Sequence, residues 1–540
     1  MFFQSLACGA LFAAAAAAAP ASPSSGSSSS SLASCVSQVF AASDPSQRIV
    51  TPENSTYTDA RLGEKIQFEE FPAIIAYAKD VAEVAPLVNC AVAHGVPPVA
   101  RSGGHHFLAY SSLNGSLVID LSHVNHVSVS ADKQTAVVGG GIRLGALYMA
   151  LDAHDVTFVG GICPTVGLGG LLSAGGFNMQ MRALGLTADY IVAAKVVLAN
   201  GTTVEASPSS NADLFWAIRG GGGNTYGIVV EATLKLDTFP RFAAMSLEWG
   251  GGDAQTRFDI AKRFLEWGPA LPKEVTSQIN VYKDTISIIG VGVGISKDEL
   301  QALVDDSGLG ALGNATIGVF GGCSTDNMRT FGYTSFACEA DDKVDKKILN
   351  VVQDPFSQFD SNPQFSYDEA TKSSAVAQAD PWSRFRRMSK SFFVLDSQPL
   401  PDDVLARVLE LIASADDASQ IWGEWHAWNL TGAPAGDSAF PWRDSAVAHL
   451  EFQMHGSNDT AQQQSYETLF AELESVLRPA IGPASYSGYM DASISVDHLE
   501  AYYGDNVERL VGIKQAYDPT NVFHNPYSIL AELPANVSSY

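Results

Sequence analysis

The chain has 540 residues, of which 46% are hydrophobic and 10% aromatic, so it is long enough for two or three domains with large cores and is not generally disordered. Its formal net charge of −26 at pH 7 repels nucleic acid and anionic membrane surfaces, and we expect neither as a partner.

The N-terminus, MFFQSLACGALFAAAAAAAPASPSS, is an apolar stretch that ends in small residues. This pattern is typical of a secretory signal peptide, which we expect at residues 1–21. A membrane anchor is the alternative, but the apolar run is short for a span. Residues 22–65 then form a flexible linker and N-terminal segment, and we expect the mature protein to be secreted and extracellular.

Seven N-x-S/T sequons agree with a secreted glycoprotein, although the triplet is common by chance. They lie at Asn54, Asn114, Asn200, Asn314, Asn429, Asn458 and Asn536.

Five cysteines remain after removal of the signal peptide, and an odd number leaves one outside the disulfides of an oxidising compartment. Cys323 and Cys338 share one loop-rich segment, and we expect them to close a short ring. Cys35 is predicted to pair with Cys90, which lies in the helical pattern EVAPLVNCAVAHG. The spacing therefore leaves Cys163.

From about residue 71, FPAIIAYAKDVAEVAPLVNCAVAHGVPPVARSGG predicts a strand, a helix and a strand. Short strands follow in SLVIDL, TAVVGGG, IVAAKVVLA and GIVVEATLKL, joined by glycine-rich turns. These patterns predict an α+β domain with a glycine-rich binding surface.

Helical and strand patterns alternate again from about residue 240. EWGGGDAQTRFDIAKRFLEWG, DVLARVLELIAS and QSYETLFAELESVL indicate helices, whereas SQIWGEWHAWNL and VAHLEFQMHG indicate strands. The simplest interpretation is a second domain with an antiparallel sheet and helices on one face.

Three glycine clusters lie in the first domain, at residues 101–106 (RSGGHH), 160–177 (GGICPTVGLGGLLSAGGF) and 219–229 (RGGGGNTYGIV). Glycine lets backbone N–H groups approach a pyrophosphate closely. None of the clusters has the G-x-G-x-x-G or Walker spacing, so a Rossmann site is not supported. One cluster alone would indicate tight turns, but the three together indicate a phosphate-bearing cofactor held by several loops.

These motifs, together with MRALGLTADYIV, resemble the FAD-binding domain of the vanillyl-alcohol-oxidase superfamily, which is of the PCMH type. The tail YYGDNVERLVGIKQAYDPTNVFHNPYSI resembles the C-terminal signature of berberine-bridge enzymes, a group similar to secreted fungal oligosaccharide oxidases. The resemblance implies an FAD-binding domain built from both chain ends, residues 66–240 and 491–540. It also implies an inserted substrate domain at 241–490, with a large antiparallel sheet backed by helices.

In that family a histidine after the R-S-G-G turn is bonded to the flavin 8α-methyl group, and the cysteine of G-x-C-P-T-V-G is bonded to ring carbon 6. The matching residues are His105 and Cys163, which would account for the fifth cysteine, while His106 is expected to be structural. The other cofactor-binding residues that the resemblance implies are Arg101, Ser102, Gly103, Gly104, Val166, Gly167, Gly170, Gly227, Ile228 and Asn525.

Val166 occupies the position where members that use dioxygen carry a small β-branched residue. This implies an oxidase that forms hydrogen peroxide; ordinary packing is the alternative. Two positions depart from the family pattern: Leu171 stands where many relatives have histidine, and the tail has NPYSI where NPQSI is usual.

The segment GYMDASIS resembles the family's N-Y-x-D, whose tyrosine deprotonates the substrate hydroxyl, with Gly488 in place of asparagine. Tyr489 is therefore the candidate catalytic base. Because a phenol has a pKa of about 10, we expect positive charge or hydrogen bonds to activate it.

Strand periodicity in IWGEWHAWN places Trp422, Glu424, His426 and Trp428 on one face. A carboxylate between tryptophans suits a sugar, with Glu424 as a candidate catalytic residue and the other three as substrate contacts; a buried core is an equal alternative. In HLEFQMH, the residues on one face are His449, Glu451, Gln453 and His455. Gln453 falls where some alkaloid-oxidising relatives carry a catalytic glutamate, and it is a further candidate.

The sequence thus predicts a secreted, monomeric FAD-dependent oxidase without a metal ion, which passes hydride from a substrate hydroxyl to flavin N5 and electrons to O2. We expect the anomeric carbon of an oligosaccharide as the site of oxidation, giving a lactone. The alternatives are an oxidase that tailors a small secondary metabolite and a non-catalytic glycoprotein dimer linked through Cys163.

Overall fold

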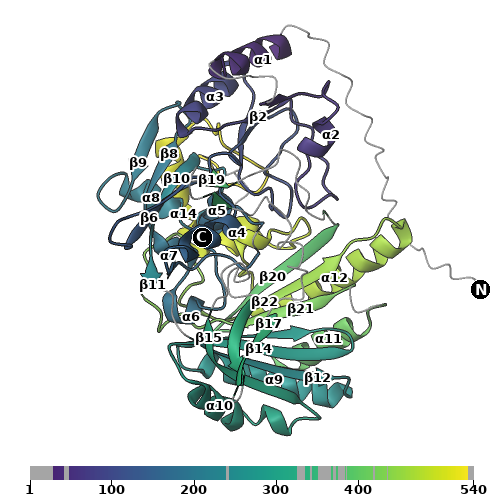
Figure 1. The fold of residues 1–540 in the computed structure, drawn as a ribbon. Coiled ribbons are helices and arrows are strands. Elements are labelled where there is room, and N and C mark those ends of the chain that lie inside the picture. The colour runs from purple at the N-terminus through teal and green to yellow at the C-terminus, as the bar shows by residue number, and fades with distance from the viewer. Residues whose placement is uncertain are drawn as a thin grey trace, which may run out of the picture.

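The fold comes from a computed structural model, which describes residues 28–41, 48–163, 165–238, 242–324, 335–340, 343–350, 367–368, 373–374, 384, 386–416, 420–434 and 436–532. Two domains are stacked on each other (Figure 1). The first contains two small sheets from the N-terminal part of the chain, together with the C-terminal helices, and the second is built on one large sheet.

A four-stranded sheet in the order β1-β2-β4-β3 begins the first domain. Its strands are β1 (Ile49–Val50), β2 (Ile74–Tyr77), β3 (Pro98–Arg101) and β4 (Leu117–Asp120). Strands β2, β4 and β3 are parallel, as expected for strands such as IIAY and LVID that are buried along their whole length. The connection from β2 to β3 is α3 (Val81–Ala93), whose first turn is capped by Asp80 and Glu83.

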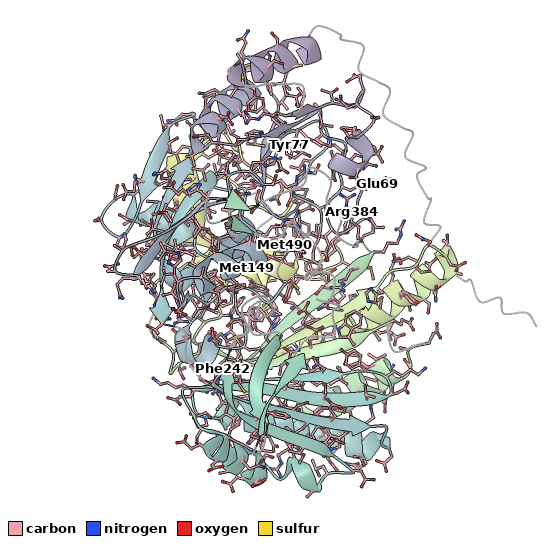
Figure 2. The ribbon with its side chains drawn as sticks, viewed as in Figure 1. Glu69, Tyr77, Met149, Phe242, Arg384 and Met490 are labelled. Carbon is pink, nitrogen blue, oxygen red and sulfur yellow. A yellow bond between two sulfur atoms is a disulfide. The ribbon has the colours of Figure 1, made fainter. Side chains whose placement is uncertain are left out.

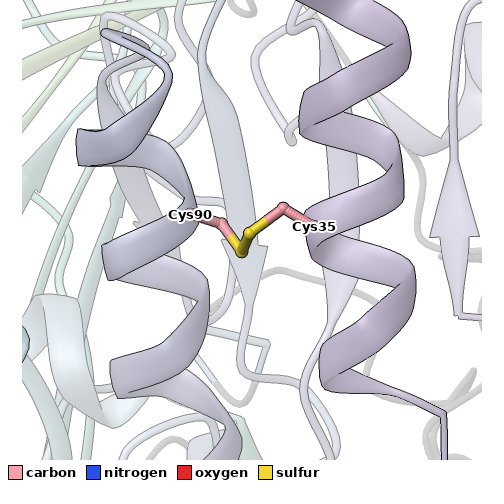
Figure 3. Close-up of a disulfide and its surroundings, with 2 residues drawn as sticks. All are labelled: Cys35 and Cys90. Atoms are coloured by element: carbon pink, nitrogen blue, oxygen red, sulfur yellow. A yellow bond between two sulfur atoms is a disulfide. The ribbon is translucent and has the colours of Figure 1, made fainter.

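The helix α1 (Ser28–Val39) packs beside α3 and is joined to it by a disulfide between Cys35 and Cys90 (Figure 3). The two Cα atoms lie 5.8 Å apart. The predicted pairing is confirmed.

An antiparallel five-stranded sheet in the order β5-β6-β10-β8-β9 completes the first domain. Its strands are β5 (Val127–Val129), β6 (Thr135–Gly139), β8 (Ile191–Val197), β9 (Thr203–Ala206) and β10 (Ile228–Lys235). Between them lie α4 (Leu144–Asp152), β7 (Val156–Thr157), α5 (Leu168–Ala174), α6 (Met181–Leu184), α7 (Thr187–Tyr190) and α8 (Ala212–Ala217).

The C-terminal helices α13 (His498–Tyr503) and α14 (Val507–Tyr517) return to this domain. The buried Lys514 Nζ forms an ion pair with Asp518 at 2.7 Å and donates a hydrogen bond to the carbonyl oxygen of Thr225 at 2.6 Å. The expectation that both chain ends build one domain is therefore confirmed.

The second domain has a nine-stranded antiparallel sheet in the order β17-β16-β15-β12-β14-β13-β21-β22-β20. Its strands are β12 (Phe242–Gly250), β13 (Val275–Val281), β14 (Thr285–Val293), β15 (Thr316–Ser324), β16 (Ser335–Ala340), β17 (Lys343–Asn350), β20 (Arg387–Leu395), β21 (Trp422–Ala427) and β22 (Ala446–His455). The helices on its apolar face are α9 (Ala254–Ala270), α10 (Lys297–Asp306), α11 (Asp402–Ala413) and α12 (Thr460–Ile481), and they share one hydrophobic core with the sheet. The strands β12 to β15 were not predicted individually, since glycine and serine interrupt their apolar runs.

Side chains fill both domains, and Met490, the neighbour of Tyr489 in the chain, lies near the middle of the molecule (Figure 2). The 3-10 turn η5 (Ser487–Tyr489) precedes Met490 and faces the polar side of the large sheet. Within the described residues, no helix has the length and apolarity that a membrane span requires.

Several predictions about processing fall partly outside the described residues. Residues 1–21 and Asn536 lie outside them. Cys323 is disulfide-bonded, but the side chain of its expected partner Cys338 is not among those described. The sequon residues with exposed side chains are Asn54, Asn114, Asn200, Asn314 and Asn458. By contrast, Asn429 is half-buried and its Nδ2 donates a hydrogen bond to the carbonyl oxygen of Pro269 at 3.0 Å.

Candidate active site

A cavity lies where the first domain meets the polar face of the large sheet. All three glycine clusters and the C-terminal tail contribute to its walls. All but one of the predicted cofactor-binding residues line it. Those that do are His105, Cys163, Ser102, Gly103, Gly104, Val166, Gly167, Gly170, Gly227, Ile228 and Asn525.

The exception is Arg101, which does not line the cavity and whose prediction as a cofactor ligand stays a prediction. Arg101 is 7% exposed and lies opposite Asp120 in the β3–β4 pairing. Its Nε donates to Asp120 Oδ2 at 2.5 Å and its Nη1 to the carbonyl oxygen of Ala60 at 2.7 Å. The guanidinium therefore ties the end of the parallel sheet to the N-terminal segment.

Close contact between two loops explains the glycines beside the cavity. A Cβ on Gly103 would lie 2.3 Å from the backbone nitrogen of Gly167, so neither loop could carry a side chain there without moving. At Gly170 a Cβ would meet no atom within 4 Å, because this residue borders open space.

The cavity also has the polar groups that a dinucleotide would need. The hydroxyls of Tyr226 and Tyr503 are buried and have no hydrogen-bond partner among the described residues, and both tyrosines line the cavity. Buried polar groups are normally paired, so these hydroxyls indicate a missing polar ligand. Together with the open glycine wall, they fit a flavin dinucleotide.

His105 and Cys163 come from separate loops and line the same cavity. His105 Nδ1 lies 3.2 Å from Oε2 of Glu64, and Cys163 is an exposed thiol. Glu64 also forms an ion pair with Lys65, and both residues line the cavity. They were not predicted, because the local sequence RLGEKIQFEE shows no motif.

Tyr489 also lines the cavity, but its surroundings differ from the expected ones. Burial, followed by the nearby charge of Glu451, raises the pKa of Tyr489 well above its usual value. Burial and the charge of Glu451 thus favour the protonated form of Tyr489, whereas the sequence predicted activation by positive charge or hydrogen bonds.

Glu451 is a site residue that the sequence placed on the correct face of its strand but did not assign to the site. It is 1% exposed, lines the cavity and accepts a hydrogen bond from Ser389 Oγ at 3.2 Å. The β21–β22 register places it opposite Glu424. Burial, with the charge of Glu424 added to it, raises the pKa of Glu451 well above its usual value, and contact with Tyr489 partly offsets this.

Gln453 also lines the cavity, two residues further along β22. Its Oε1 is buried without a hydrogen-bond partner among the described residues, so it is available to a ligand. Arg387, which pairs with His455 in the β20–β22 register, contributes a positive charge to the same wall.

The predicted face of β21 exists, but its aromatic residues do not line the cavity. Trp422 Nε1 donates to Glu424 Oε1 at 2.7 Å, and burial raises the pKa of Glu424. His426 is 2% exposed, and burial lowers its pKa to about 3. Trp428 is 0% exposed and belongs to a hydrophobic cluster with Phe393. Of the two alternatives, the buried core therefore describes Trp428, which is not a sugar-stacking residue.

Phe177 is at the centre of this cluster and explains the burial. Its ring centroid lies 5.1 Å from that of His426, 5.2 Å from Trp428 and 5.5 Å from His449. Phe177 belongs to the second glycine cluster and covers the part of the sheet face that contains these three rings. Glu451, on the same face, lines the cavity.

The two departures from the family pattern have different outcomes. Leu171 lines the cavity, so an apolar side chain stands at the position where many relatives have histidine. Tyr527, the unusual residue of NPYSI, packs its ring 4.7 Å from His498 and 6.0 Å from Tyr110. Tyr110 in turn packs 4.9 Å from His106, whose pKa is lowered by desolvation to about 4 and which also lines the cavity.

Comparisons with known proteins agree with this site. Residues 72–207 match the family model described as FAD binding domain, and residues 485–530 match the one described as Berberine and berberine like. The chain is 54% identical over 505 residues to the FAD-linked oxidoreductase pynB of Aspergillus niger, covering 93% of both chains. It is 56% identical over 483 residues to the FAD-linked oxidoreductase pytB of Aspergillus terreus, covering 89% of this chain and 60% of that one.

Solved structures show the same fold. The BBE-like 1 protein of Physcomitrella patens matches with a TM-score of 0.73 and 25% identity, covering 92% of this chain and 100% of that one. A glucooligosaccharide oxidase from Acremonium strictum with 6-S-cysteinyl, 8α-N1-histidyl FAD matches with a TM-score of 0.74 and 19% identity, covering 93% and 99%. The glycine-lined cavity, the two family models and the identity to fungal relatives together make this chain a member of the berberine-bridge-enzyme-like family of FAD-linked oxidoreductases.

Proposed function

We propose that this protein is a secreted oxidase whose FAD is bonded to both His105 and Cys163, and that it oxidises a hydroxyl group of a small, partly apolar organic molecule. The observation that carries the proposal is the meeting of His105 and Cys163, from loops far apart in sequence, at one glycine-lined cavity. The glucooligosaccharide oxidase of the same fold carries both kinds of bond.

Bound FAD supplies a two-electron acceptor for a substrate hydride and passes the electrons to O2, which yields hydrogen peroxide. The protein has to remove the hydroxyl proton. Tyr489 and Glu451 line the cavity and interact with each other, which supports Tyr489 as the group that hydrogen-bonds the substrate oxygen. The proton passes from the substrate to the Tyr489 oxygen while the Tyr489 proton passes to the Glu451 carboxylate.

Electrostatics favour this relay over a lone tyrosinate. An ionised Tyr489 beside Glu451 would place two negative charges together in a buried site, and the pKa of Tyr489 is accordingly raised. A buried carboxylate is a stronger base than an exposed one, since burial disfavours its charged form. The raised pKa of Glu451 therefore brings its basicity closer to what proton abstraction at neutral pH needs.

The wall of the cavity supports a small, partly apolar substrate rather than the oligosaccharide predicted first. Leu171, Phe107 and Phe177 contribute apolar surface, whereas Trp428 and His426 are buried and unavailable for stacking on a sugar ring. The relatives at 54% and 56% identity are named only as FAD-linked oxidoreductases. The alternative prediction, an oxidase that tailors a small secondary metabolite, is thus the better supported.

Secretion is proposed from the N-terminal pattern and from the disulfide between Cys35 and Cys90, since disulfides persist in oxidising compartments. The exposed sequons are the proposed glycosylation sites. Asn429 is excluded from them, because its amide nitrogen is already hydrogen-bonded within the fold.

Acid precipitation tests the flavin bonds. We expect the wild-type pellet to remain yellow, the His105→Ala and Cys163→Ala pellets to remain yellow because one bond persists, and the pellet of the double variant to be colourless. A flavin adduct on both residues by peptide mass spectrometry would confirm the assignment. A colourless wild-type pellet would refute it.

Peroxide release tests the substrate class. A panel of benzylic and other small apolar alcohols is compared with aldoses and chitooligosaccharides at equal concentrations. We expect a higher kcat/KM for members of the first group; turnover of the sugars alone would restore the oligosaccharide prediction.

A further inference from the structure

Two adjacent charged residues are buried at the wall of the cavity without an assigned role. The Glu64 side chain is 13% exposed and the Lys65 side chain 2%. Charged side chains are rarely buried to this degree, because removing them from water is unfavourable. The ion pair between Glu64 and Lys65 offsets part of this desolvation cost. The same two residues on the surface would not have the cost at all.

The backbone fixes Glu64 beside the loop that carries His105. The Glu64 N–H donates a hydrogen bond to the carbonyl oxygen of Gly104 at 3.0 Å. A Cβ on Gly63 would lie 2.6 Å from the same oxygen, so only glycine permits this approach. The result is a distance of 3.2 Å between Glu64 Oε2 and His105 Nδ1.

Lys65 lines the same cavity as Cys163. Its Nζ lies 4.3 Å from the centre of the Phe107 ring and forms an ion pair with Glu64. It interacts electrostatically with Cys163, whose thiol is exposed to the cavity. Lys65 thus places a positive charge on the cavity wall that Cys163 also lines.

We propose that Glu64 and Lys65 prepare the two flavin attachment residues, Glu64 by accepting the imidazole proton of His105 and Lys65 by stabilising the thiolate of Cys163. This rests on the covalent flavin of the proposed function. In each attachment a C–H bond of the flavin, at the 8α-methyl group or at carbon 6, is replaced by a bond to nitrogen or sulfur. One proton leaves each partner, and the two electrons reduce O2 to hydrogen peroxide.

The charges around the pair agree with these roles. Burial alone would raise the pKa of Glu64, but the charges and hydrogen bonds of His105 and Lys65 hold it well below the usual value, which favours the carboxylate as a hydrogen-bond acceptor. A carboxylate of lowered pKa is a weak base, so it takes the His105 proton only as bond formation to the flavin makes the imidazole N–H acidic. Burial lowers the pKa of Lys65, with Arg387 adding to this, while Glu64 and Cys163 act in the opposite direction. Since the thiolate is the reacting form of cysteine, a cation beside it promotes bond formation.

The test measures each bond separately in the full-length protein. Cys163→Ala leaves only the imidazole bond, and His105→Ala leaves only the thiol bond. Protein from a riboflavin-starved host is mixed with FAD in air, and covalent incorporation is followed by intact mass and by flavin fluorescence after denaturation. The exposed Glu69→Gln and Lys79→Met are the matched controls.

In the Cys163→Ala background, we expect Glu64→Gln to slow incorporation by about 10²-fold, the usual contribution of a positioned proton acceptor. In the His105→Ala background, we expect Lys65→Met to slow incorporation. It should also move the pH midpoint of Cys163 alkylation by iodoacetamide upward by at least about one unit, because the thiolate loses a neighbouring cation.

Conservative variants separate these roles from folding. Lys65→Arg retains the charge and should retain the thiol bond, whereas Glu64→Asp retains the ion-pair charge but draws the carboxylate back from His105 and should slow only the imidazole bond. Unchanged rates and an unchanged alkylation midpoint in the Gln and Met variants would overturn the inference. Absence of covalent FAD from the wild type would instead overturn the proposed function.

Discussion

Glu451 and Tyr489 form a pair in which the tyrosine cannot ionise without placing its charge beside a carboxyl group. The Glu451 side chain is held by Ser389 on β20 and lies opposite Glu424 on β21. Arg387 is the positive charge that partly offsets the two carboxyl groups. The proposed relay therefore assigns proton acceptance to Glu451 and the contact with substrate to Tyr489.

This arrangement predicts the pH dependence of activity. The pKa of Glu451 is raised, so the group is protonated and inactive at low pH, and kcat/KM rises as the pH increases through that raised value. Glu451→Gln should lower kcat by about 10²–10⁴-fold and remove this acidic limb, as measured by peroxide release across pH. Glu248→Gln, at an exposed carboxylate on β12, is the control. An acidic limb that persists in Glu451→Gln would assign it to another group.

The raised pKa of Glu451 also predicts how the stability of the folded protein depends on pH. Its folded-state pKa is raised, so the folded protein binds this proton more tightly than the unfolded chain does. Stability contributed by the proton is present at low pH and is lost as the pH rises through the raised value. Glu451→Gln should therefore flatten the alkaline decline of Tm in calorimetric scans, and an identical decline in both proteins would contradict this.

At the scale of elements, strands β21 and β22 divide their residues between two environments. Trp425 and Phe452 enter the core beneath the helices, while Glu424 and Glu451 face the cavity side. Along that cavity side the environment changes again, because Phe177 covers the end of the face that contains Trp428.

The burial of Trp428 predicts a structural effect of its removal. Trp428→Ala should lower the free energy of unfolding by about 3–5 kcal/mol, the usual cost of truncating a buried aromatic residue. The measurement is urea unfolding followed by far-UV circular dichroism. Ile317→Ala, at a residue 40% exposed on β15, is the control and should change stability by no more than about 0.5 kcal/mol. A raised KM with unchanged stability would instead return Trp428 to a role in substrate binding.

At the scale of the whole molecule, the cavity depends on the way distant segments are joined. Residues 485–532 run from the large sheet back to the first domain, where Lys514 and Asp518 are both 0% exposed. At the other end of the chain, the disulfide between Cys35 and Cys90 attaches α1 to α3 across 55 residues of sequence. Cys35 and Cys90 are not among the residues that line the cavity.

Loss of the disulfide should consequently affect stability without affecting the flavin. The double variant Cys35→Ser/Cys90→Ser should lose about 4 kcal/mol, the chain-entropy value for a loop of this length. Calorimetry should show a lower Tm for the first domain, and the acid-precipitated pellet should stay yellow. An unchanged Tm, or a colourless pellet, would contradict this separation.

The sequence by itself determined the features that depend on neighbours along the chain. Strand and helix patterns, the facing of Glu451 and Gln453 on β22, the glycine clusters and the pairing of Cys35 with Cys90 were all predicted from spacing and confirmed. These features follow from local periodicity and from the absence of a side chain on glycine, and both can be read from the sequence alone.

Only the tertiary structure decided which charges and rings meet. Arg101 pairs with Asp120, Glu64 reaches His105, and Phe177 buries Trp428. Each of these contacts joins residues from different loops or strands, so no local sequence pattern predicts it. Burial and nearby charge also set the protonation of Glu451 and Tyr489, and both depend on the packing of one domain against the other.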